Sequence, residues 1–110
     1  MIHIKEGADI SDLEKVCLKA IYKIHWLYKK LGYDLWVTSG VDGKHSKSSF
    51  HYLGLAFDIR IREFKDDVNI HDLVADIKVA LGQQFDVILH NTHIHVEYDP
   101  RELMYKIANF

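Results

Sequence analysis

Two stretches of the sequence carry side chains that could bind a metal ion together. In "HIHVE", residues 93–97, two histidines and a glutamate alternate with apolar residues. In a strand, this alternation puts His93, His95 and Glu97 on one face. Imidazoles and carboxylates that are partly buried need partners. A divalent metal ion would satisfy that need.

The second stretch is "HSKSSFHYLGLAFDIR", residues 45–60, which starts as a polar loop and ends as an apolar strand. Gly54 permits the turn that separates His51 from Asp58. Zinc binds imidazole nitrogens and carboxylate oxygens, and catalytic zinc sites have three protein ligands and a water position. His51, Asp58 and His95 would supply two imidazoles and one carboxylate. The alternative is a buried hydrogen-bonded triad without metal.

The composition is typical of one small domain, residues 1–110, with 48% hydrophobic and 27% charged residues. The formal net charge of -2 gives no reason to expect nucleic acid or an anionic membrane as a partner. The single cysteine, Cys17, excludes a disulfide within the chain and a cysteine-rich zinc site. The segment "MIHIKEGADI" lacks the apolar stretch of a secretory signal, so we expect synthesis in the cytoplasm.

Hydrophobic periodicity predicts an α+β fold, in which a small and mainly antiparallel sheet packs against helices. We expect helices over residues 11–32, 69–82 and 99–110. The predicted N-terminal signals are a Ser11–Glu14 capping box, Asn69, and Asp99. We expect strands over residues 33–40, 55–61, 85–90 and 93–98.

A resemblance to a known family comes from two motifs in order. "SFHYLGLAFD" matches S-x-H-x-x-G-x-A-x-D at every fixed position, and an H-x-H follows at 93–95. This pairing resembles the zinc peptidases that include D-Ala-D-Ala carboxypeptidases, murein endopeptidases and phage endolysins. The hedgehog signalling domain shares their fold. The resemblance implies that fold, and it implies zinc bound by His51, Asp58 and His95.

The resemblance also implies roles for the side chains around the metal. "HNTHIH" is similar to the H-x-x-H-x-H of murein endopeptidases, which makes His90 the candidate general base. Imidazole suits that role because its pKa lies near neutrality. His93 would orient the site, and His45 would stabilise the transition state. An exposed turn histidine and a solvated loop histidine are the respective alternatives for His90 and His45. Ser49 and Arg60 are candidate substrate-binding residues.

The chain departs from the carboxypeptidase pattern at two positions. Thr92 stands where those enzymes carry an acidic base. Asp42 stands near the place of the arginine that holds a terminal carboxylate. An acidic residue there favours an endopeptidase, although Lys44, Lys47 or Arg60 could compensate. Glu97 could pair with Arg60 across neighbouring strands or serve as a base.

Two function classes follow. The first is a zinc metallopeptidase that hydrolyses peptide bonds in bacterial peptidoglycan, as an endopeptidase rather than a D-Ala-D-Ala carboxypeptidase. It would be a phage or bacterial lytic enzyme that acts on the cell wall after lysis or as part of a phage particle. The alternative is a catalytically inactive, zinc-containing, hedgehog-like binding or virion structural module.

Overall fold

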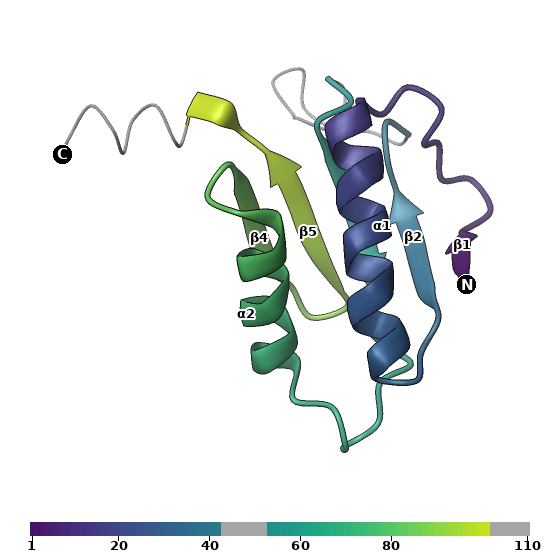
Figure 1. Cartoon of the computed structure of the whole chain (residues 1–110). Helices are drawn as coiled ribbons and strands as arrows, with labels where there is room; N and C mark the ends of the chain where they lie inside the picture. Colours follow the sequence, from purple (N-terminus) through teal and green to yellow (C-terminus); the bar gives the residue numbers. More distant parts are fainter. Residues whose placement is uncertain (43–52, 102–110) are drawn as a thin grey trace, which may run out of the picture.

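The computed structural model describes residues 1–42 and 53–101, which fold as a five-stranded sheet with two helices on one of its faces (Figure 1). The α+β prediction is therefore confirmed. The helices are α1 (Lys15–Lys30) and α2 (Ile70–Leu81). The strands are β1 (Ile2–Ile4), β2 (Leu35–Ser39), β3 (Ala56–Arg60), β4 (Phe85–Leu89) and β5 (His93–Tyr98).

The sheet is mixed, with the strand order β1-β2-β3-β5-β4. Neighbouring strands are antiparallel except for β1 and β2, which are parallel. The parallel pair arises because α1 carries the chain back along the sheet between β1 and β2, as a crossover helix does. The prediction of a mainly antiparallel sheet is thus confirmed, and β1 is an addition to it.

The core lies between the sheet and the two helices. Alternate strand residues point to this side and are fully buried, among them Val37, Phe57, Ile59, Ile94 and Val96. They pack against helix residues that include Cys17, Ile24, Tyr28, Leu73 and Ile77. Cys17 is fully buried in this core, and burial raises the pKa of its thiol to about 12. The Tyr28 hydroxyl donates to the Arg60 carbonyl at 2.9 Å, which ties α1 to the end of β3.

The helix ends confirm one predicted capping signal and contradict another. The Asn69 side chain accepts hydrogen bonds from the backbone N–H groups of the first turn of α2, as expected. The Ser11–Glu14 capping box is wrong, because α1 begins at Lys15. The backbone N–H groups that a Ser11 cap would bind are already used, because that of Leu13 donates to the Ile10 carbonyl and that of Glu14 to the Gly54 carbonyl. The predicted C-terminal helix lies largely outside the described residues.

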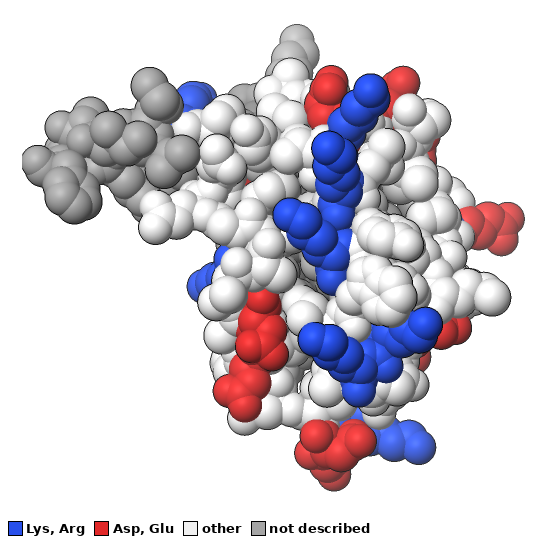
Figure 2. Space-filling view, in the orientation of Figure 1, with Lys and Arg blue, Asp and Glu red and all other residues white. Residues whose placement is uncertain are grey.

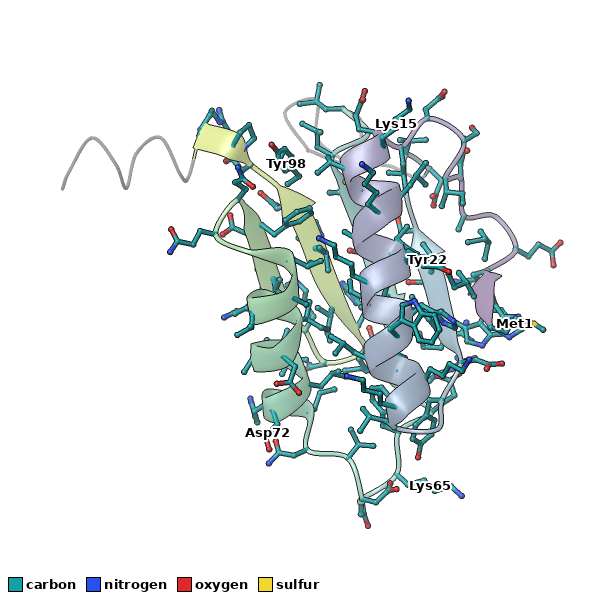
Figure 3. The ribbon with its side chains drawn as sticks, viewed as in Figure 1. Met1, Lys15, Tyr22, Lys65, Asp72 and Tyr98 are labelled. Carbon is teal, nitrogen blue, oxygen red and sulfur yellow. The ribbon has the colours of Figure 1, made fainter. Side chains whose placement is uncertain are left out.

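The outer surface of α1 is basic and partly apolar. Lysine side chains gather over this helix, and acidic side chains lie over α2 (Figure 2). α1 contains five lysines and no acidic residue. Tyr22 projects from its outer side (Figure 3), with Leu18 and Trp26 also exposed. Across the part of the chain that the structure describes, neither helix combines the length and the apolar character needed to cross a membrane.

Candidate metal centre

The pairing of β3 with β5 assembles the candidate site. Asp58 lies opposite His95, and Arg60 lies opposite His93. Because residues alternate between faces along a strand, these side chains point away from the core that the intervening Ile59 and its neighbours form. This confirms the predicted alternation. The site occupies the sheet face that no described helix covers.

The His95 imidazole lies between two carboxylates. Its Nδ1 atom is 2.9 Å from Asp58 Oδ1, and its Nε2 atom is 2.7 Å from Glu97 Oε1. The three side chains are mostly buried, with 16%, 16% and 22% exposure for His95, Asp58 and Glu97. The hydrogen bond to Asp58 is the main cause that raises the pKa of His95. Burial opposes it, and the bond to Glu97 adds to it.

This arrangement fits a metal ligand. A neutral imidazole has one N–H and one lone pair. When Nε2–H donates to Glu97, the Nδ1 lone pair faces an oxygen of Asp58. That contact is repulsive unless His95 takes a second proton or a cation binds both atoms. A carboxylate that holds the outer N–H of a metal-binding histidine is the usual environment of such ligands. A doubly protonated His95 satisfies both contacts as a hydrogen-bonded triad without metal. A zinc ion bound by His95 Nδ1 and Asp58 would satisfy them as well, with Glu97 as the supporting carboxylate.

A complete ligand set cannot be traced within residues 1–42 and 53–101. These residues contain no group of three histidine, cysteine, aspartate or glutamate side chains arranged to hold a metal. The predicted third ligand, His51, lies outside the described residues. The same holds for His45 and Ser49, the predicted transition-state and substrate residues.

The turn between β4 and β5 gathers the three histidines of "HNTHIH". The His90 ring centroid lies 4.8 Å from that of His93 and 6.5 Å from that of His95. The backbone N–H of His90 donates to the His93 carbonyl at 2.9 Å, which closes the turn. His93 Nε2 is 3.9 Å from Asp58 Oδ2. His90 is exposed at the rim of the site, and His93 is half-buried within it.

Arg60 lies on the face of Asp58, but it does not pair with Glu97. Its Nη1 atom is 3.2 Å from Glu63 Oε1, and its guanidinium stacks on the Trp36 ring at 4.7 Å. The sheet register explains the difference. Glu97 lies opposite Ala56, and Arg60 is four residues further along β3, a strand distance of about 13 Å. The suggested cross-strand pair is therefore wrong, and Glu97 binds His95 instead.

Asp42 has a structural role that the sequence did not reveal. Its Oδ1 atom accepts hydrogen bonds from the backbone N–H groups of Gly40 at 2.7 Å and Asp9 at 2.8 Å. A Cβ atom at Gly40 would lie 2.1 Å from the Asp9 carbonyl oxygen, so only glycine allows this approach. The Asp42 carboxylate thus holds the N-terminal segment against the end of β2. The pairing of β2 with β3 is irregular beside this contact, between Val37 and Ser39.

Two large hollows of the described surface lie away from this site. They have volumes of about 740 and 690 Å³, border α2, and contain no histidine in their lining. Comparison of the chain with protein-family models, with curated proteins and with solved structures finds no match.

Proposed function

We propose that this chain is a zinc metallopeptidase that hydrolyses peptide bonds in bacterial peptidoglycan, with a preference for internal bonds. The proposed fold is that of the D-Ala-D-Ala peptidases and the hedgehog signalling domain. One observation carries the proposal: the His95 imidazole lies between Asp58 and Glu97 on the open sheet face. The zinc ligands would be His51, Asp58 and His95.

The protein's own side chains would prepare the metal ligands. With its Nε2–H donated to Glu97, His95 would offer Nδ1 as the ligand atom. His93 Nε2, at 3.9 Å from Asp58 Oδ2, would act on that carboxylate through its charge when it is protonated. When bound, zinc would polarise the scissile carbonyl and lower the pKa of water to about 7. The low exposure of the ligands strengthens these electrostatic effects, because little water screens them.

His90 is the proposed general base. Its exposed imidazole lies at the rim of the site, with its ring centroid 6.5 Å from that of His95. From this position it would accept a proton at one ring nitrogen and deliver it to the leaving amine. Histidine suits both transfers because its ordinary pKa lies close to neutrality. Position 42, where the carboxypeptidases that the chain resembles carry an arginine, is Asp42 and offers no cation for a terminal carboxylate, which favours cleavage of internal bonds.

Digestion of purified peptidoglycan tests the proposal directly. Zinc-loaded protein should release peptide fragments that mass spectrometry assigns to cleavage within stems or cross-links. Treatment with a chelator should stop the release, and added zinc should restore it. Free D-Ala as the main product would contradict the preference for internal bonds. Full zinc occupancy without any cleavage would contradict the enzyme and favour an inactive zinc-containing binding or virion structural module.

A further inference from the structure

A small basic pocket adjoins the candidate metal centre on the same face of the sheet. Its volume is about 230 Å³, and it is lined by Lys5, Thr38, Arg60, Arg62, Thr92 and His93. These residues come from four strands or the segments next to them. The backbone N–H of Lys5 donates to the Val37 carbonyl at 2.9 Å, which fixes the segment after β1 beside β2.

The charges of this pocket favour an anion. Lys5, Arg60 and Arg62 carry positive charges, and Glu63 is the carboxylate that contacts both arginines, at 3.2 and 3.4 Å. One carboxylate balances one of the three cations. The Arg62 side chain is 70% exposed, so most of its N–H groups can reach a ligand. The Thr38 hydroxyl donates to the Asp58 carbonyl at 3.4 Å, and the Thr92 hydroxyl pairs with His93 Nδ1 at 3.0 Å, so an anion would bind chiefly through the cationic side chains.

The position of the pocket limits where a substrate anion would lie. Arg60 and His93 are each two residues along their strands from Asp58 and His95. Two residues of a strand advance about 7 Å. An extended peptide advances about 3.3–3.6 Å per residue. A carboxylate in the pocket would therefore lie about two residues from the bond held at the metal centre.

We propose that this pocket is a subsite for a substrate carboxylate located about two residues from the cleaved bond. The inference rests on the proposed peptidase function and specifies its substrate as an acidic stem peptide. Arg62 and Lys5 bind the carboxylate. The guanidinium of Arg60 is held in place by its stacking on the Trp36 ring. The spacing excludes the carboxylate of a single released terminal residue, which would lie only about one residue from the bond.

Matched muropeptides test the pocket. The probes are disaccharide-tetrapeptides with free stem carboxylates and the same compounds with those carboxylates amidated. The zinc-loaded full chain should prefer the free acid by on the order of tenfold, the scale of one charged hydrogen bond. The preference is a ratio of kcat/KM where the compounds are cleaved and a ratio of Kd where they are not. The Lys5→Gln, Arg62→Gln double variant should reduce that ratio to about one.

Lys19→Gln provides the control, because Lys19 is exposed on α1 at the opposite side of the sheet. It changes a lysine to glutamine in the same way and should keep the wild-type ratio. The proposed carboxylate subsite would be overturned if the wild type used the free acid and the amide equally. An unchanged acid-to-amide ratio in the double variant would also overturn it. A preference in Kd without cleavage would support the pocket and contradict only the peptidase function. Cleavage without a preference for the free acid would contradict the pocket and support the peptidase function.

Discussion

The Nδ1 atom of His95 lies 2.9 Å from Oδ1 of Asp58, although 37 positions separate the two residues in the sequence. The antiparallel register of β3 and β5 creates this contact, because it places the two residues directly opposite each other. Glu97 then binds the other nitrogen of the same ring. The pair is therefore held from two sides before any metal binds.

Replacement of Glu97 tests the supporting carboxylate. In Glu97→Ala, the Nε2–H of His95 loses its acceptor, so the ring is free to turn and its tautomer is no longer fixed. We expect zinc affinity to fall by about 10–100-fold, as is usual for such partners. Competition with a chromophoric chelator measures the change. Asp76→Ala, which removes an exposed carboxylate of α2, is the control. Equal affinities in the two variants would exclude this role of Glu97.

Replacement of His90 tests the general base. His90→Ala should retain zinc, because His90 is not a proposed ligand, and should reduce turnover on peptidoglycan by roughly 100-fold or more. His71→Ala, at an exposed position of α2, should keep wild-type turnover. Unchanged turnover in His90→Ala would remove this residue from the mechanism and direct attention to His93 or Glu97.

Gly54 should be essential because the chain passes close to the Asp12 backbone just before β3 begins. It has a φ angle of +72°, and a Cβ atom there would lie 2.3 Å from the Asp12 carbonyl oxygen. Gly7 has a φ angle of +88° but no atom near its Cβ position. Gly7→Ala should therefore cost about 1 kcal/mol of unfolding free energy. Gly54→Ala should cost about 1–3 kcal/mol more, because it adds a steric clash with backbone.

Urea unfolding of the two glycine variants supplies the comparison. Equal losses of stability in Gly54→Ala and Gly7→Ala would show that the contact with Asp12 does not constrain the chain.

Asp99, directly after β5, should make stability depend on acidity. Its side chain is 11% exposed, and Arg101 contacts the carboxylate at 3.0 and 3.2 Å. The hydrogen bond from the Arg101 side chain is the main cause that lowers the pKa of Asp99. A carboxyl group with a lowered pKa stabilises the fold above its unfolded pKa of about 3.9 and loses this effect as pH falls through the folded value.

Asp99→Asn should therefore be less stable than the wild type at pH 7, by about 1 kcal/mol or less because Arg101 is exposed to solvent. The difference should disappear as the pH falls below about 4. Thermal unfolding at a series of pH values measures it. A difference that stays constant down to pH 2 would contradict the charge-based origin.

Much of the fold was predictable because its signals are local. The alternation in "HIHVEY" predicts the two faces of β5, and Asn69 predicts the start of α2. β1 was missed because three residues are too few to show a period. The Ser11–Glu14 signal was misleading because the Glu14 backbone N–H donates to the Gly54 carbonyl, and a partner so distant in the sequence is not part of the capping pattern.

The site was predictable only in part. Residue types and spacing selected Asp58 and His95, and the structure places them in contact. The partner of Glu97 is either His95 or Arg60, and the register of β3 with β5 decides between them. That register cannot be predicted from the sequence of either strand alone. The basic pocket was missed for a similar reason. Lys5, Thr38 and Thr92 are distant in sequence, and only the strand order β1-β2-β3-β5 brings them together.

The zinc content of the purified chain tests the central claim most directly. Protein prepared without added metal and then dialysed against zinc should bind one equivalent, as measured by plasma emission spectrometry. Asp58→Asn and His95→Ala should lose most of that zinc, because each removes one proposed ligand. His71→Ala should retain it. Wild-type protein that takes up no zinc, or a His95→Ala variant with undiminished zinc, would contradict the account.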